Sequence, residues 1–291
     1  MTRRTLVLLL SLGGVAAANP DAETQCRGGD QTACMNVAAN LLTSSDASGY
    51  KRAAELGEKA CKAHVRRACT NLGAQYQKGM GVKPDEKRAT ALFKNACDDK
   101  DSLGCHNFGV SLRDGLGTKK DLVASTKMFV RACGLDPRDG CSEASLAYRD
   151  GIGVTKDAVQ ATQLAYTGCQ GDDGGACTLY AVALEDGVGT KRDVKAAADM
   201  NKNACRLGDV VGCNNLALMY TNGTGVAKDL TKSFELYRST CDSGYDVACF
   251  NVGNKYRSGL GTKQDDAAAN TAYERACKKG LAKACDQLPK R

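Results

Sequence analysis

The sequence predicts an all-α protein, a right-handed α/α superhelical solenoid built from repeated helix hairpins. Three observations support this prediction. Cysteines occur as eight Cys-x7-Cys pairs, and from Cys61 onward each pair recurs after 36 residues. Two glycines recur in a fixed register between the pairs, and so does one aspartate. A constant period of this length is the signature of a stacked architecture, in which each unit contacts only its neighbours.

The first eighteen residues have the features of a secretory signal peptide. Arg3 and Arg4 precede the apolar run 6–12, and the alanines 16–18 precede a cleavage site before Asn19. The apolar run is too short to span a bilayer. We therefore expect residues 1–18 to direct export, and residues 19–291 to form a solenoid without a membrane anchor, in the periplasm or secreted.

One unit illustrates the helices expected in each repeat. Apolar residues from Cys69 to Tyr76 follow the spacing of one helix face, and Gly79 ends that helix as a left-handed cap. Asp85 is the expected N-cap of a second helix, which ends near Cys97. The next cysteine lies on the following helix. The same capping aspartate recurs at Asp121, Asp157, Asp193, Asp229 and Asp265.

The two end units depart from this pattern. The unit between Cys34 and Cys61 is one residue short, and the serine-rich stretch 44–49 replaces its glycine turn. The last unit has only six residues after Cys285, and Pro289 cuts off its helix. Atypical end units are expected because they must cap a stack of repeats. We expect about seven units and about fifteen helices, with no internal linker.

The cysteine count favours a disulfide framework. All sixteen cysteines fall into pairs, and an even number in an exported protein indicates disulfides. Zinc sites use shorter Cys-x2-4-Cys spacings. We expect one bond within each pair, joining the end of one helix to the start of its neighbour. The pairs are Cys26/Cys34, Cys61/Cys69, Cys97/Cys105, Cys133/Cys141, Cys169/Cys177, Cys205/Cys213, Cys241/Cys249 and Cys277/Cys285.

The pattern Ala68-Cys-Thr-Asn-Leu-Gly-x-x-Tyr76-x-x-Gly79-x-Gly81-Val-x-x-Asp85 resembles the Sel1-like repeat, a TPR-like helix hairpin. Its cysteine-bearing form of 36 residues resembles the Helicobacter cysteine-rich protein family, over residues 26–288. A mitochondrial Sel1-repeat factor for cytochrome oxidase assembly shares the cysteine form, but the signal peptide here is bacterial in style. Members of the Helicobacter family have been classed as penicillin-binding proteins and β-lactamases. The resemblance therefore implies an alternative function, as a penicillin-binding protein or a weak β-lactamase.

Asparagine recurs two residues after the second cysteine of a pair. One primary amide can both donate to and accept from a peptide bond, so a ladder of amides on the concave face can grip an extended peptide. Alternatively, each amide bonds a carbonyl in the adjacent turn and ties the units together. Glu143 and Leu179 replace asparagine in the middle units. The predicted peptide-binding residues are Asn36, Asn71 and Asn107 at one end and Asn215 and Asn251 at the other.

Catalytic motifs are weak. The chain contains one Ser-x-x-Lys, from Ser48 to Lys51, but neither companion motif of the serine β-lactamases, and Ser48 stands where a helix N-cap belongs. The two histidines, His64 and His106, are too few for a zinc hydrolase and are expected on the surface. We predict no catalytic residue, metal site or cofactor, and an enzymatic role remains the open alternative.

The charge and composition favour a protein or peptide partner. The formal net charge is +7, and it falls to about +5 without Arg3 and Arg4. Basic residues are spread along the chain without an aromatic stripe, so no nucleic-acid partner is expected. We predict a monomeric scaffold that binds a protein or peptide of the cell envelope or outside the cell.

Overall fold

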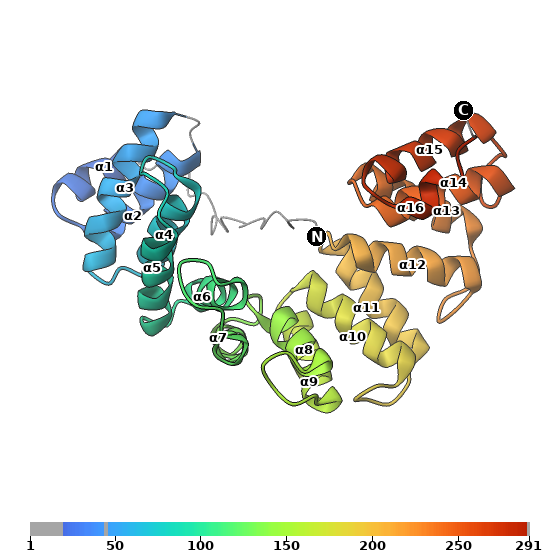
Figure 1. The fold of residues 1–291 in the computed structure, drawn as a ribbon, viewed down its shortest axis with the longest axis horizontal. Coiled ribbons are helices and arrows are strands. Elements are labelled where there is room, and N and C mark those ends of the chain that lie inside the picture. The colour runs from blue at the N-terminus through green and yellow to red at the C-terminus, as the bar shows by residue number, and fades with distance from the viewer. Residues whose placement is uncertain (1–19, 44–45, 290–291) are drawn as a thin grey trace. The chain divides into compact units, whose positions relative to one another are not determined.

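The computed structural model describes residues 20–43 and 46–289, which divide into two compact units (Figure 1). These residues form sixteen α-helices joined by turns, which confirms the prediction of an all-α chain of helix hairpins. The expected number was about fifteen. The predicted signal peptide, residues 1–18, lies outside the described residues.

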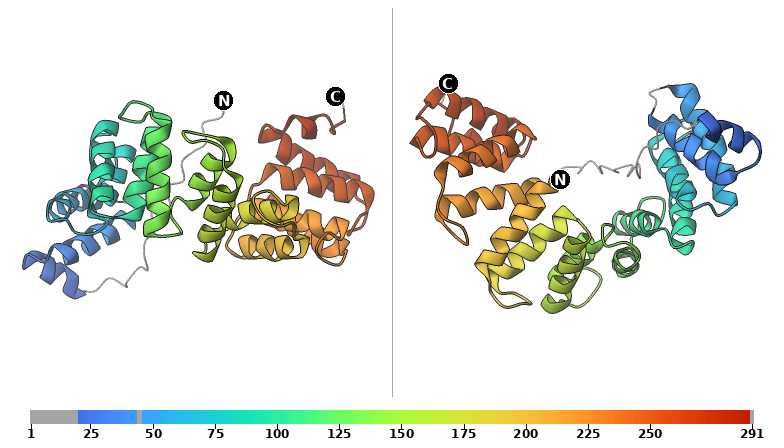
Figure 2. Two further views of the ribbon diagram at one scale, coloured as in Figure 1. Left: turned by 90° about the horizontal axis from the view of Figure 1, so that it is seen from below. Right: turned by 180° about the vertical axis from the view of Figure 1, so that it is seen from behind.

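The first unit extends to Gly140 and also includes the turn Ile152–Val154. Consecutive helices of this unit pack against one another in chain order, as Figure 2 shows. Its helices are α1 (Pro20–Arg27), α2 (Gln31–Thr43), α3 (Ala47–Lys62), α4 (Ala68–Lys78), α5 (Glu86–Asp98), α6 (Ser102–Asp114) and α7 (Leu122–Leu135).

The second unit comprises Cys141–Gly151 and the chain from Thr155 onward. Here too each helix packs against the next. Its helices are α8 (Cys141–Asp150), α9 (Ala158–Gln170), α10 (Gly174–Asp186), α11 (Val194–Arg206), α12 (Val210–Asn222), α13 (Leu230–Asp242), α14 (Asp246–Ser258), α15 (Asp266–Lys278) and the short α16 (Ala282–Cys285).

The helix ends are set by the predicted caps. Gly79, with φ of 71°, ends α4, and its N–H bonds the carbonyl of Gln75. Asp85 caps α5 by accepting a hydrogen bond of 2.9 Å from the N–H of Arg88. Such a cap stabilises a helix by about 1 kcal/mol. Asp121, Asp157, Asp193, Asp229 and Asp265 make the same cap in their repeats.

The second glycine of each turn is required by a close approach between repeats. Gly117 has φ of 64°, and a Cβ placed there would lie 2.2 Å from the carbonyl oxygen of Glu86, the first residue of α5. A Cβ on Gly115, in the same turn, would meet nothing nearer than 3.5 Å. The first glycine therefore ends the helix, and the second lets the turn lie on the preceding repeat. Equivalent approaches occur at Gly81, Gly153, Gly189, Gly225 and Gly261.

A threonine hydroxyl adds a hydrogen bond to this contact in several repeats. Thr90 on α5 donates to the carbonyl of Leu116, between the two turn glycines, at 2.7 Å. This bond satisfies a turn carbonyl that no helix can pair. Thr126 donates to Ile152 in the same way, and Thr162 donates to Val188.

The disulfides join the second helix of one repeat to the first helix of the next. Cys97 on α5 pairs with Cys105 on α6, with their Cα atoms 4.3 Å apart, and both side chains are buried. Cys133 and Cys141 are also disulfide-bonded, and no described cysteine is free. The remaining predicted pairs are confirmed: Cys26–Cys34, Cys61–Cys69, Cys169–Cys177, Cys205–Cys213, Cys241–Cys249 and Cys277–Cys285.

The interior of a hairpin pairs a small residue on the first helix with a ring on the second. A Cβ on Gly73 of α4 would lie 2.6 Å from the ring of Phe93 on α5, which is fully buried. Gly253 and Tyr273 repeat this arrangement on α14 and α15. Packing of one ring against a bare backbone draws the two helices together. It explains how a chain with few aromatic residues fills its core.

The prediction of Ser48 as the N-cap of α3 is wrong. Asp46 takes that position, and its carboxylate accepts hydrogen bonds from the N–H groups of Ser48 at 3.2 Å and Gly49 at 3.3 Å. The hydroxyl of Ser48 also donates to Asp46. Serine and aspartate both cap helices well, but only the carboxylate carries the negative charge that a helix N-terminus attracts. Residues 44 and 45 of the predicted serine-rich turn lie outside the described residues.

Candidate binding surfaces

The five predicted asparagines occupy the same register position but differ in exposure. Each lies on the first helix of its repeat: Asn36 on α2, Asn71 on α4, Asn107 on α6, Asn215 on α12 and Asn251 on α14. Asn36 is exposed, whereas Asn71, Asn215 and Asn251 are half-buried. Asn107 is only 4% exposed, so its amide cannot grip the backbone of a bound peptide in this conformation.

Hydrogen bonding separates these side chains further. The Nδ2 of Asn251 donates to Oδ1 of Asn214, on the preceding first helix, at 3.1 Å. This amide therefore ties two repeats together, but its partner is a side-chain oxygen on α12 and not the turn carbonyl of the alternative interpretation. The Nδ2 of Asn107 is buried without a partner. Asn36, Asn71 and Asn215 make no side-chain hydrogen bond to another described residue, so their amides are available to a ligand.

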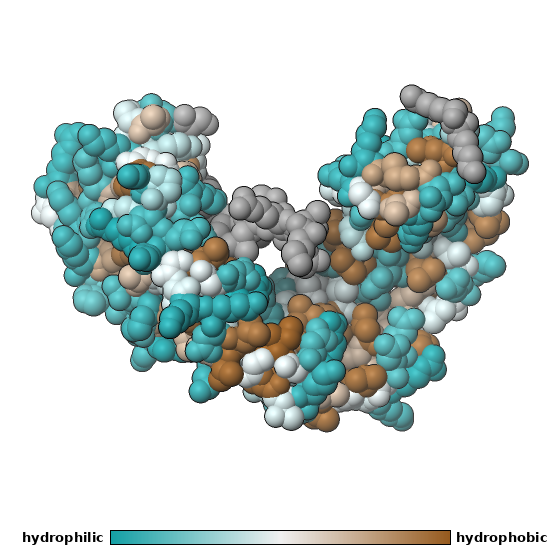
Figure 3. Space-filling view, in the orientation of Figure 1, coloured by the Kyte–Doolittle hydropathy of each residue, from teal (hydrophilic) through white to brown (hydrophobic). Residues whose placement is uncertain are grey.

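An apolar cavity occupies the place where the asparagine register is broken. It has a volume of about 180 Å³ and lies between α8, α9 and α10. Its lining is mostly aliphatic, with Leu179, Val182, Val188 and several alanines, and also includes Ser145, Arg149, Thr162 and Asp186. Val188 is 50% exposed and Val182 37%. In Figure 3, apolar residues gather over α8 and α9, whereas the face over α1–α5 is mostly hydrophilic. A ligand here would meet mainly aliphatic groups in place of amides.

A hydroxyl-to-carboxylate bond that we did not predict from the sequence links successive repeats. Ser142 on α8 donates to Asp173 at 2.6 Å, and Asp173 also caps α10 by accepting from the N–H of Ala176. Burial raises the pKa of Asp173, and the bond from Ser142 opposes this. Thr70 and Asp101 make the same link in the first unit, as do Thr178 and Asp209 in the second. The pattern in the sequence has two parts. A serine or threonine directly follows the second cysteine of one pair, and an aspartate lies four residues before the second cysteine of the next pair.

A cavity of about 520 Å³ lies between α3, α4 and α5 in the first unit. Its lining is rich in carboxylates, from Glu58, Asp98 and Asp99. Glu58, on α3, accepts a hydrogen bond of 3.1 Å from the hydroxyl of Tyr76 and pairs with the guanidinium of Arg88. The guanidinium also lies 4.4 Å from the centre of the Tyr76 ring. This bridge holds a carboxylate between two consecutive second helices.

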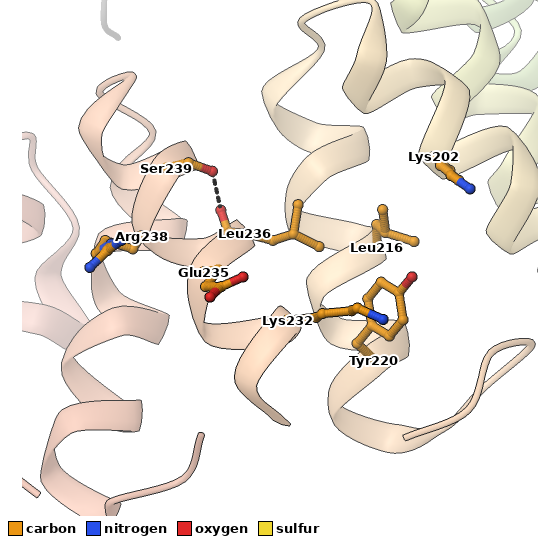
Figure 4. Close-up of a pocket in the computed structure, with 8 residues that line it drawn as sticks. All are labelled: Lys202, Leu216, Tyr220, Lys232, Glu235, Leu236, Arg238 and Ser239. Atoms are coloured by element: carbon orange, nitrogen blue, oxygen red, sulfur yellow. Dashed lines mark hydrogen bonds between the residues drawn. The ribbon is translucent and has the colours of Figure 1, made fainter. Parts of the chain in front are cut away.

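The corresponding cavity of the second unit has the opposite charge. It has a volume of about 510 Å³ and lies between α11, α12 and α13. Figure 4 shows Leu216 and Leu236 facing each other across it, with Tyr220 and Lys232 side by side. The other charged residues of its lining are Lys202, Arg238 and Glu235.

The residues named for catalysis do not form a catalytic arrangement. The hydroxyl of Ser48 is bonded to Asp46, and no hydrogen bond joins it to a lysine. His64 is exposed and pairs with Asp99 at 2.9 Å. His106 reaches the surface only in part, because it is half-buried with its ring 5.6 Å from that of Phe129. Among the residues that the structure describes, no three His, Cys, Asp or Glu side chains are grouped so that they could hold a metal ion.

A buried lysine contacts hydroxyl groups in the second unit. The Nζ of Lys255 donates to Thr221 at 3.0 Å, and the hydroxyls of Thr221 and Ser233 are 2.6 Å apart. Burial lowers the pKa of Lys255, and it raises the pKa of nearby Tyr237 to about 12. Ser233 is completely buried, so it cannot attack a substrate from solvent. This group links α12, α13 and α14.

No helix among the described residues is both long and apolar enough to cross a bilayer.

Six stretches of the chain match the family model described as Sel1 repeat. They are residues 66–101, 102–136, 140–173, 175–209, 210–245 and 246–281. A sequence comparison with curated proteins finds no match.

Several solved structures are similar to this chain. A protective antigen of uropathogenic Escherichia coli, which displays an SLR fold, is 24% identical with a TM-score of 0.74 over 91% of this chain. The chain spans only 57% of the length of that antigen. A Sel1 repeat protein from Oxalobacter formigenes is 22% identical with a TM-score of 0.72, over 82% of this chain and 96% of that one. Cysteine rich protein B of Helicobacter pylori is 28% identical over 46% of this chain and 96% of its own, with a TM-score of 0.38. The first two likenesses show a solenoid of helix hairpins.

Proposed function

This chain belongs to the Sel1-repeat family, whose repeats are protein-interaction modules, and we propose that it is an exported scaffold that binds an extended segment of a partner protein. The observation that carries this proposal is that three asparagine amides on first helices make no hydrogen bond to another described residue. Asn36, Asn71 and Asn215 share one register position, and none is engaged by another described residue. An amide that its own protein leaves unbonded at a repeated position is available for a peptide backbone.

The proposed mechanism is recognition of the ligand backbone. A side-chain amide can donate to a peptide carbonyl and accept from a peptide N–H at the same time. Each such bond contributes about 1 kcal/mol net, so affinity grows in small steps with the number of amides engaged. Asn36 and Asn71 provide this contact in the first unit and Asn215 provides it in the second. Asn107 and Asn251 are left out, because the first is buried and the second is bonded to Asn214.

The disulfides support export. Cross-links in successive repeats form and persist in an oxidising compartment and are rare in the cytosol. Together with the signal peptide predicted in residues 1–18, they favour the periplasm or the outside of the cell as the place where the partner is met. Secretion of a fusion of residues 1–25 to a reporter enzyme would test the signal peptide directly.

Peptide display on the oxidised protein tests the binding proposal. Peptides selected on the wild-type protein are measured by isothermal titration against Asn36→Ala, Asn71→Ala and Asn215→Ala. At about 1 kcal/mol for each lost bond, we expect each change to weaken binding by about fivefold. Peptides that span one unit should respond only to the asparagines of that unit.

Two further variants act as controls. Gln163→Ala removes an exposed amide from a second helix, α9, and should leave affinity unchanged. Asn251→Ala removes the bond to Asn214, so it should lower stability more than affinity. Selected peptides that bind Asn71→Ala and Asn215→Ala as tightly as Gln163→Ala would show that the amides do not hold the ligand.

A further inference from the structure

The first unit shows what the groove between two second helices can hold. Glu58 places its carboxylate there, between the hydroxyl of Tyr76 and the guanidinium of Arg88. Glu58 is eleven residues before the second cysteine of the repeat, Tyr76 seven after it and Arg88 nineteen after it. In the first unit, a tyrosine and an arginine at these repeat positions therefore bind a carboxylate of the protein itself.

The second unit has the same groove without the carboxylate. At the three equivalent positions it has Lys202, Tyr220 and Lys232. All three line the open cavity, whereas Tyr76 and Arg88 do not line the cavity of the first unit, because Glu58 bridges them. The replacement of the acid by Lys202 removes the acceptor of the tyrosine hydroxyl and adds a second cation.

We infer that the cavity between α11, α12 and α13 binds a carboxylate side chain of a partner protein. The carboxylate would take the place that Glu58 has in the first unit, accepting from the hydroxyl of Tyr220 and pairing with Lys202 and Lys232. The facing Leu216 and Leu236 would receive an aliphatic residue next to it (Figure 4). The site does not depend on the asparagine proposal, because neither Asn215 nor Asn251 lines this cavity.

The charges of the lining support an anionic ligand. Three cationic side chains line the cavity, and Glu235 is the one carboxylate among its lining residues. Lys202 has no ion pair with another described residue. Lys232 pairs with Asp229 at 3.3 Å, but its side chain is 61% exposed, and an exposed pair is easily exchanged. A carboxylate that is also bonded by Tyr220 can replace Asp229 in that pair.

The test introduces a carboxylate into the cavity by substitution. Lys202→Glu recreates the arrangement of Glu58, Tyr76 and Arg88, so it should close the cavity without loss of fold. The probe is the acetylated and amidated peptide Glu-Leu-Glu, titrated into the oxidised protein and followed by NMR of Leu216, Tyr220 and Leu236. We expect saturable shifts in the wild-type protein and at least about tenfold weaker binding to Lys202→Glu.

Matched controls isolate the cause. Lys195→Glu makes the same charge change on an exposed part of α11 outside the cavity, so it should retain most of the binding. The peptide Gln-Leu-Gln, which lacks the charges, should bind at least about tenfold more weakly than Glu-Leu-Glu. Asn215→Ala should bind Glu-Leu-Glu normally, which separates this site from the amide contacts. No saturable shift at Tyr220, equal binding of both peptides, or equal effects of the two lysine changes would each overturn the inference.

Discussion

Replacing the two glycines of one turn should cost very different amounts of stability. Gly115 and Gly117 both have positive φ, 74° and 64°, so alanine at either position adds the strain of a left-handed residue, about 1 kcal/mol. They differ in what the new methyl group meets. At Gly115 the nearest atom is 3.5 Å away, but at Gly117 the carbonyl oxygen of Glu86 is only 2.2 Å away.

The methyl group at Gly117 cannot be accommodated by a rotamer change, because the atoms it meets belong to the backbone. The turn has to move by about 1 Å from α5, which opens a packed interface. Overpacking of this kind costs about 3 kcal/mol. Movement of the turn also weakens the hydrogen bond of 2.7 Å from Thr90 to Leu116, for about 1 kcal/mol more. We therefore expect a loss of about 1 kcal/mol for Gly115→Ala and about 4–5 kcal/mol for Gly117→Ala.

Urea unfolding of the oxidised variants, followed by far-ultraviolet circular dichroism, measures both losses. Because the stability of a repeat protein includes a term for each interface, the loss in Gly117→Ala should be concentrated where α5 meets the turn. Amide hydrogen exchange should show increased opening of α5 and α6 in that variant. Equal losses for the two substitutions would refute the reasoning, since they share the conformational strain and differ only in the contact.

Two more predictions concern cross-links and protonation. Cys97→Ala/Cys105→Ala should lower the free energy of unfolding more than Cys277→Ala/Cys285→Ala. Removing either disulfide costs about 2.5 kcal/mol of loop entropy. The first pair is also fully buried, whereas Cys277 is half-buried and Cys285 is exposed, so the first change loses more buried contacts. Urea unfolding that gives the larger loss for the terminal pair would contradict this. Burial lowers the pKa of Lys255 below 10.5, so the unfolded chain holds this proton more tightly than the folded protein does. The stability should therefore rise with pH between the lowered folded pKa and 10.5, and Lys255→Met should remove that rise. Parallel pH profiles of unfolding free energy for the two proteins would show that the lysine is not the cause.

Much of the fold is predictable because it is specified locally. The positions of Asp85 and Gly79 follow from the chemistry of helix ends, and repetition confirms each assignment several times over. The prediction fails at Ser48, in the unit that lacks the glycine turn and so has no repetition to guide it. Asp46 lies two residues earlier and caps the helix better. A single sequence offers no second copy of that segment from which to correct the assignment.

The candidate sites were less predictable because they depend on contacts between repeats. The sequence places Asn215 and Asn251 in one register, but only the structure shows that Asn251 is bonded to Asn214 while Asn215 is unbonded. The sequence shows that Glu58 and Lys202 occupy the same position in two different repeats. It does not show that the tyrosine hydroxyl points at this position, and the proposed carboxylate site depends on that contact.

The disulfides have a consequence for proteolysis outside the cytosol. Each joins the second helix of one repeat to the first helix of the next, so a cut between Cys97 and Cys105 would leave both fragments covalently attached. The glycine turns have no such protection. Lys119 and Lys120 are exposed between α6 and α7, and cleavage there would produce two fragments held together only by packing. The glycine turns therefore resist cleavage only through their close packing against the preceding repeat. A cut in a disulfide-bridged turn leaves the two fragments joined.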